Sequence, residues 1–152
     1  MPDPTNPAQV LTRISSDAAC LHQTLRVLPA DRGASTSALA ARITEAQDLV
    51  GTALRLFLAL SPQASRPSPT DLLLLHRVAQ IVKAAQDAAA ELTAALARAM
   101  ENQRRQADAT SRRVVLIGPT PQQFIESAAD LLDRIPALCD AVSRDRPESP
   151  CH

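Results

Sequence analysis

One stretch, residues 69–113, most constrains what this chain can fold into, because it contains neither Gly nor Pro after its first residue. Ala, Leu, Gln, Glu and Arg dominate it, and all of these have high helix propensity. Apolar residues recur along it at alternating steps of three and four, which places them on one face of a helix. These positions are Leu75, Val78, Val82, Ala85, Ala89, Leu92, Leu96 and Ala99. The stretch is therefore predicted to form one long amphipathic helix.

A second apolar row runs beside the first on the same predicted helix. Its members are Leu74, Ile81, Ala88 and Ala95. Two adjacent rows make a face broad enough for two neighbouring helices, as the central member of a bundle requires. The heptad spacing is also typical of coiled coils. The sequence therefore predicts an all-α fold.

Three shorter helices are predicted around this one. They cover residues 7–28, the segment from the Ser-Thr-Ser cap at 35–37 to residue 60, and the segment from residue 120 to about residue 144. Pro136 should kink the last of them or end it near Arg134. Together the helices predict a four-helix up-down bundle in a single domain, residues 1–152. Residues 61–68 are expected to be a Pro/Ser linker, and residues 1–6 and 145–152 disordered ends.

The predicted helices differ in length, and this mismatch is the main functional clue. The shorter helices would each span roughly 30–36 Å, whereas the third would be nearly twice as long. Either the third helix breaks near residues 102–111, or its second half projects and pairs with the last helix. A second copy or a helical partner would then complete the core. The apolar residues 114–117 are expected to form a last helical turn or an extended plug at the end of the bundle.

The overall charge argues against a general binder of nucleic acid or anionic membranes. The chain has 16 basic and 16 acidic residues, so it lacks the positive field that such binding needs. The longest apolar runs are much shorter than the ~20 residues that span a bilayer. Three cysteines in no framework spacing suit a reducing compartment, and the first residues do not resemble a secretory signal. A cytoplasmic protein is expected, with Cys20 and Cys139 as small core residues.

The chemistry-bearing residues do not form a pattern typical of catalysis. His76 could serve phosphotransfer, but Ala79 stands where such modules usually carry Lys, and Lys83 is two turns away. Cys20 and His22 point about 200° apart on a helix, and no metal-binding spacing is present. The predicted loops contain no His that could activate a nucleophile. The sequence therefore predicts a non-enzyme without catalytic residues, metal or cofactor.

Arginines are concentrated in the second half of the long helix. Arg98, Arg104, Arg105, Arg112 and Arg113 outnumber Glu101 and Asp108, a local surplus of three positive charges (five minus two). A solvated helix with local ion pairs explains them, and an acidic partner or nucleic acid is the functional alternative.

These observations favour a non-enzymatic helical-bundle interaction protein, such as an adaptor, scaffold or accessory regulatory subunit. It would act by self-association, with a dimer favoured, or by binding a helical protein partner, and not at a membrane. Its predicted interaction residues are Leu92 and Leu96, with Arg98, Arg104, Arg105, Arg112 and Arg113 as a rim that gives specificity. The alternative is a nucleic-acid-associated regulator that uses residues 98–113.

Overall fold

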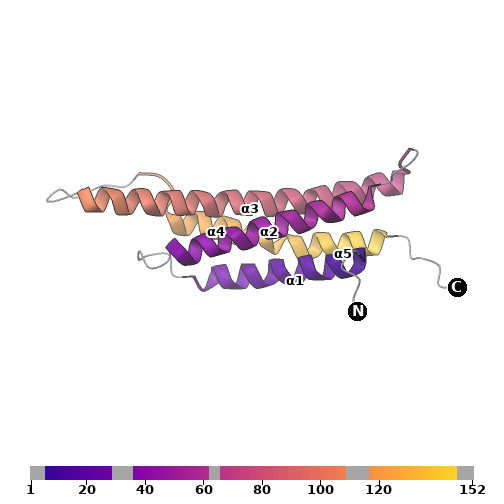
Figure 1. Ribbon diagram of the computed structural model, residues 1–152, viewed down its shortest axis with the longest axis horizontal. Coiled ribbons are helices and arrows are strands. Elements are labelled where there is room, and N and C mark those ends of the chain that lie inside the picture. Colours follow the sequence, from indigo (N-terminus) through magenta and orange to yellow (C-terminus); the bar gives the residue numbers. More distant parts are fainter. Residues whose placement is uncertain (1–5, 29–35, 62–65, 109–116, 147–152) are drawn as a thin grey trace.

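The computed structural model describes residues 6–28, 36–61, 66–108 and 117–146, and every regular element in these ranges is an α-helix. The helices are α1 (Pro7–Arg26), α2 (Thr36–Leu60), α3 (Pro69–Asp108), α4 (Pro121–Asp133) and α5 (Ile135–Asp145). They lie side by side in an elongated bundle (Figure 1). The prediction of an all-α fold of packed helices with a long third helix is confirmed.

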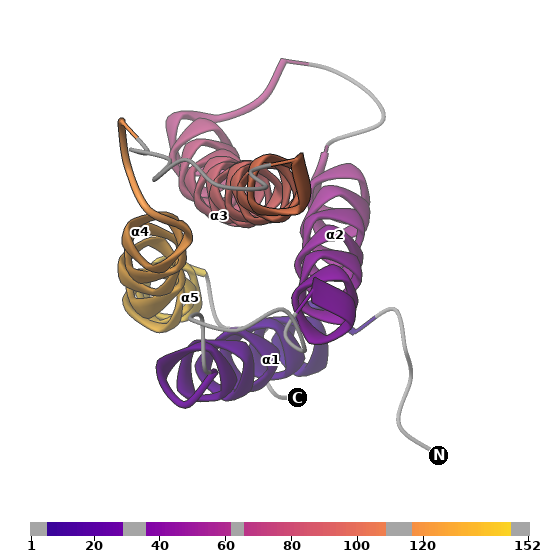
Figure 2. The ribbon, with the colours of Figure 1, turned by 90° about the vertical axis from the view of Figure 1, so that its left-hand side faces the viewer.

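The helices form a ring when the bundle is viewed along its length (Figure 2). α2 contacts α1 on one flank and α3 on the other, and both α4 and α5 contact α3 and α1. α4 and α5 follow one another and together occupy the fourth position of the ring. In Figure 1 the sequence colours run in the same direction along α1 and α3 and in the opposite direction along α2.

The division between α4 and α5 follows from Pro136. Proline lacks the backbone N–H that would bond the carbonyl four residues earlier, and its ring clashes with that carbonyl. α4 accordingly ends at Asp133, Arg134 stands between the helices, and α5 begins at Ile135. The prediction that the last helix ends or kinks near Arg134 is confirmed.

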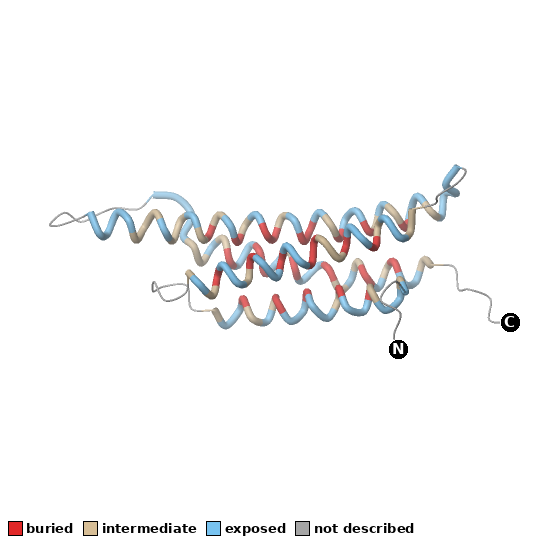
Figure 3. The backbone as a smooth tube through the Cα atoms, in the orientation of Figure 1, coloured by how far each residue is buried: buried red, intermediate tan, exposed pale blue. Residues whose placement is uncertain are grey.

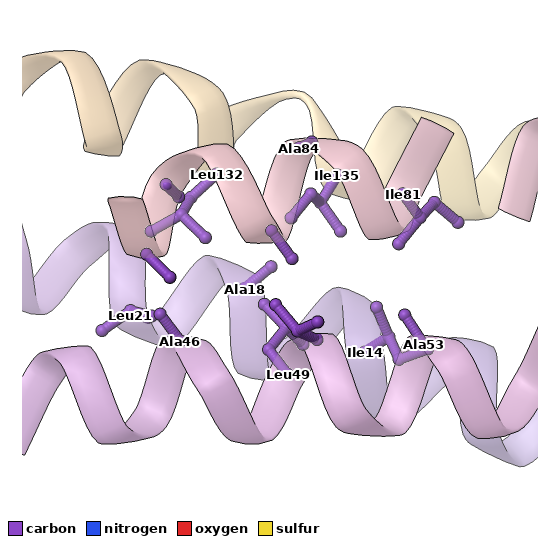
Figure 4. Close-up of a cluster of buried hydrophobic side chains, with 14 of the residues drawn as sticks. Ile14, Ala18, Leu21, Ala46, Leu49, Ala53, Ile81, Ala84, Leu132 and Ile135 are labelled. Carbon is purple, nitrogen blue, oxygen red and sulfur yellow. The ribbon is translucent and has the colours of Figure 1, made fainter. Parts of the chain in front are cut away.

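Every buried residue in the described ranges is apolar. The buried residues lie along the stretches where the helices run beside one another (Figure 3), and side chains from different helices meet between them (Figure 4). Close approach is aided by small residues on α3, where five of the nine buried residues are alanines: Ala84, Ala85, Ala88, Ala89 and Ala95.

The centre of the buried face of α3 lies further around the helix than the sequence pattern indicated. Leu74, Ile81, Ala88 and Ala95, which the pattern placed in a second row, are all buried. The first row is buried only in part, since Leu75, Val82, Leu96 and Ala99 are half-buried. The reason is that α3 has α2 on one flank and α4 with α5 on the other, so the middle of its apolar face points at the bundle axis.

α3 is continuous over 40 residues, about 60 Å of helix. The predicted break is therefore wrong for residues 102–108, and residues 109–111 lie outside the described ranges. Ion pairs between Glu101 and the arginines three and four positions later support these turns, as such spacings do in helices. The end of α3 extends past the other helices in Figure 1, and no described residue after Ala95 is buried along it.

Three further predictions need correction. α1 ends at Arg26 and not at residue 28. Cys20 is exposed, because it lies one position, about 100°, from the buried Leu21, whereas Cys139 is buried as expected. Ile117 is 83% exposed and so is not a plug at the bundle end. Residues 114–116, which belong to the same prediction, lie outside the described ranges.

The tight alanine packing yields a stability prediction. Replacing Ala88 by Leu puts extra methylenes into a fully buried site, and we expect the free energy of unfolding to fall by about 1–3 kcal/mol. Ala90→Leu on the exposed side of α3 is the matched control and should change it by less than about 0.5 kcal/mol. Urea denaturation of both variants measures this. Equal stabilities would contradict close packing of α3.

Candidate interaction surface

The two leucines predicted to bind a partner lie against this chain's own helices. Leu92 is fully buried, and Leu96 is half-buried and packs against the same core. A partner could reach Leu92 only if the bundle opened. Both side chains therefore contribute first to intramolecular packing.

Three of the five predicted arginines make contacts within the chain. Arg98 donates a hydrogen bond to the backbone carbonyl of Ile117. Arg104 and Arg105 form ion pairs with Glu101 at 3.0 and 2.8 Å. Hydrogen bonds from Arg104 and then Arg105 hold the pKa of the Glu101 carboxyl below its usual value. Arg112 and Arg113 lie outside the described ranges.

The contact of Arg98 sits at a specialised turn before α4. Gly118 has φ +107°, a left-handed conformation that residues with a Cβ rarely adopt, and Arg98 lies beside it. Thr120 then caps α4, and Gln123 completes a capping box, with Pro121 at the start of the helix. Arg98 therefore holds the segment before α4 against α3.

The two described histidines, His22 and His76, lie in different surroundings. His76 is exposed on α3, and Lys83 pairs with Asp87 at 2.6 Å. His22 Nδ1 donates to the Ala129 carbonyl over 2.9 Å and so joins α1 to α4. In the described parts of the chain no group of His, Cys, Asp or Glu side chains is placed to hold a metal ion.

A groove of about 290 Å³ lies between α1 and α2. Three of the four charged side chains that line it have ion-pair partners, since Arg13 lies 3.7 Å from Asp17, and Glu45 lies 2.9 Å from Arg42. The residues that line it are Arg13, Asp17, Cys20, Leu21, Thr24, Glu45, Asp48, Leu49 and Thr52. The groove marks the flank of α2 that faces α1.

Exposed leucines are a feature that the sequence analysis missed. Among the described residues seven large apolar side chains are exposed, and four of them lie where α2 ends and α3 begins. These four are Leu54 (46%), Leu58 (70%), Leu72 (54%) and Leu73 (42%). The sequence does contain a sign of this exposure, because four consecutive leucines at 72–75 cannot all face one core when each step turns the helix by about 100°.

Helix geometry places the two exposed leucines of α2 on its flank next to α3. Leu49 lines the groove with α1. Leu54 and Leu58 follow it by five and nine residues, which is about 140° and 180° around the helix. They therefore lie on the side of α2 away from α1, and in the ring of Figure 2 this flank adjoins α3.

The leucines of α3 lie on different flanks of that helix. Arg77 Nε lies 2.7 Å from Asp145 Oδ2, so this side chain marks the flank of α3 that faces α5, and Leu73 is one turn before it. Leu74 points into the core, and Leu75, on the other side of Leu74 from Leu73, lies on the flank next to α2. Leu72 is one turn before Leu75.

An apolar strip thus follows the outside of the contact between α2 and α3. Ala79 and Val82 continue it one and two turns beyond Leu75. We call this strip the α2–α3 seam and define it as Leu54, Leu58, Leu72, Leu75, Ala79 and Val82.

Comparisons of the chain with protein-family models, with curated proteins and with solved structures find no match. Within the described ranges, none of the helices combines the length and the apolar character needed to cross a membrane.

The glycines provide a test of the turn before α4. Gly118→Ala should lower the free energy of unfolding by about 1–2 kcal/mol, because φ is positive there. Gly51→Ala is the opposite control. It lies within α2, a new Cβ would meet only Arg55 at an ordinary 3.7 Å, and Ala should stabilise the helix by up to about 1 kcal/mol. Denaturant titration measures the change in the free energy of unfolding for each variant. Two changes of the same sign would contradict the roles given to these glycines.

Cys139 provides a pH prediction. Burial, and then the charge of Asp140, raise the pKa of its thiol from 9.0 to about 12. The pKa of the thiol in the folded state lies above its value in the unfolded state. The contribution of Cys139 to the free energy of unfolding is therefore complete below pH 9 and is lost as the pH rises toward 12. The difference in Tm between the wild type and Cys139→Ala should therefore shrink over this pH range. Circular dichroism melts measure it, and a pH-independent difference would refute the assignment.

Proposed function

We propose that this chain is a non-enzymatic interaction protein, an adaptor, scaffold or accessory regulatory subunit that binds another helix through its surface. The observation that carries the proposal is the α2–α3 seam, with Leu58 at 70% and Leu72 at 54% exposure. Contiguous exposed apolar side chains are typical of interaction sites. The bound helix belongs either to a second copy of this chain or to another protein.

The groove between two packed helices suits a helical ligand. An amphipathic helix places its apolar residues at i, i+3, i+4 and i+7, and these fit between two parallel ridges of side chains. α2 and α3 supply such ridges, with Leu54 and Leu58 one turn apart on α2 and Leu72 and Leu75 one turn apart on α3. Burial of each leucine side chain contributes up to about 1.5–3 kcal/mol.

We place the protein in the cytoplasm. Cys20 and Cys139 are both free thiols, as a reducing compartment favours.

Nucleic-acid binding draws less support than helix binding. Arg104 and Arg105 share Glu101, and Arg98 donates to a backbone carbonyl. Contacts to phosphate would have to compete with these partners. The arginine segment therefore remains the second candidate, and the seam is the first.

The proposal is tested by photo-crosslinking from single positions. A photoreactive residue in place of Leu58 should give a discrete covalent adduct in cells that produce the protein, because this side chain lies in the proposed contact. The same residue in place of Val27, which is equally exposed at 70% but lies after α1, should give no such adduct. The mass of the adduct distinguishes a second copy from another protein. Absence of an adduct at 58, or the same adduct at both positions, would overturn the proposal.

A further inference from the structure

We infer that the occupant of the α2–α3 seam is an acidic amphipathic helix of another protein. This inference rests on the proposed function, namely that the seam binds a helix. It adds the chemistry of the partner, which the charges around the seam indicate.

The seam has a defined length. On α3 it extends from Leu72 to Val82, ten residues or about 15 Å. Beyond it, the next exposed positions on the same flanks are polar, with Gln47 on α2 and Gln86 on α3. A partner helix would therefore make apolar contact over about two to three turns.

The charges that surround the seam are mainly positive. Arg55 lies next to Leu54 on α2, and Arg66 precedes the first turn of α3. Arg55 contacts the neutral hydroxyl of Thr52 at 3.3 Å, and Arg66 has no acidic side chain within ion-pair distance among the described residues.

Two of the three acidic groups near the seam have charged partners, and the third, Asp71, bonds only to the backbone. Asp71 accepts a hydrogen bond from the backbone N–H of Ser68 at the start of α3. Asp145 pairs with Arg77, and Asp87 pairs with Lys83. α2 has no acidic residue after Asp48. Arg55 and Arg66 thus outnumber Asp71, which has no charged partner in the described ranges, so the rim keeps a surplus of one positive charge (two minus one) that an acidic partner would complement.

This charge pattern disfavours a second copy as the occupant. In a two-fold symmetric dimer the same patch faces itself, so its surplus of positive charge would face a second surplus of positive charge. Like charges placed opposite one another weaken and misdirect association. Met100 on α3 is another exposed apolar side chain, and it lies next to Glu101 in the sequence. The Glu101 carboxylate is already paired with Arg104 and Arg105.

The experiment compares two synthetic helices of about 18 residues with the same leucine face. One has Glu at the positions that flank this face, and its twin has Lys at those positions. Fluorescence anisotropy titration of the full chain should show the Glu helix binding at least about tenfold more tightly than the Lys helix. Added salt should weaken binding of the Glu helix, as expected for exposed charges.

Variants assign the effect to the seam. Leu58→Glu should abolish binding of the Glu helix, and Val27→Glu, at an equally exposed site outside the seam, should leave it unchanged. Arg55→Gln combined with Arg66→Gln should bring the two helices to similar affinity. Circular dichroism checks that each variant keeps its fold.

The remaining outcomes separate the inference from the proposed function. Equal binding of the two helices, lost in Leu58→Glu, would keep helix binding and overturn the acidic partner. A dimer in light scattering that Leu58→Glu dissociates would also overturn the inference and keep the proposed function through self-association. Binding of anionic phospholipid vesicles in place of either helix would overturn both, and so would the absence of any binding.

Discussion

The structure depends on the burial of α3 along both of its flanks. α2 covers one flank and α4 with α5 cover the other, so α3 joins the two sides of the ring, as α1 does across from it. The buried part of these contacts is apolar, because no polar or charged residue is buried in the described ranges. Apolar burial is not directional. The position of α3 is therefore set by shape, and the alternation of leucines with alanines such as Ala85 and Ala88 supplies that shape.

Much of this fold could be predicted from the sequence, because its determinants are local. Helix propensity, apolar spacing and caps are read within a few residues, and they placed the helices, the long α3 and the interruption at Pro136. The exact face of α3 depends instead on where its neighbours lie. Leu75 and Leu74 are equally apolar, and only the ring arrangement makes Leu74 the buried one. The predicted break near residues 102–111 also failed over 102–108, since ion pairs sustain helix where an apolar stripe ends.

The candidate site was harder to predict for the same reason. Leu92 fits a partner-binding stripe in the sequence as well as it fits a core, and its burial becomes evident only when α3 is surrounded. The arginines were visible as a cluster, but their partners were not. Ile117 contributes a backbone carbonyl to Arg98 from 19 positions along the chain, a contact that residue identity does not encode. The four consecutive leucines at 72–75 were the one sequence feature that indicated exposed apolar side chains, since a helix cannot bury four consecutive positions against one core.

The two kinds of group around the seam would contribute differently to recognition. The leucines can supply affinity, because removing apolar area from water is favourable whatever the partner's sequence. By themselves they would accept any apolar helix, including one from a second copy. Arg55 and Arg66 add little affinity at an exposed rim, but they favour partners of opposite charge and speed their approach. The charges of Arg55 and Arg66 would therefore determine whether the seam binds a second copy or another protein. A seam without these arginines would bind both with similar affinity.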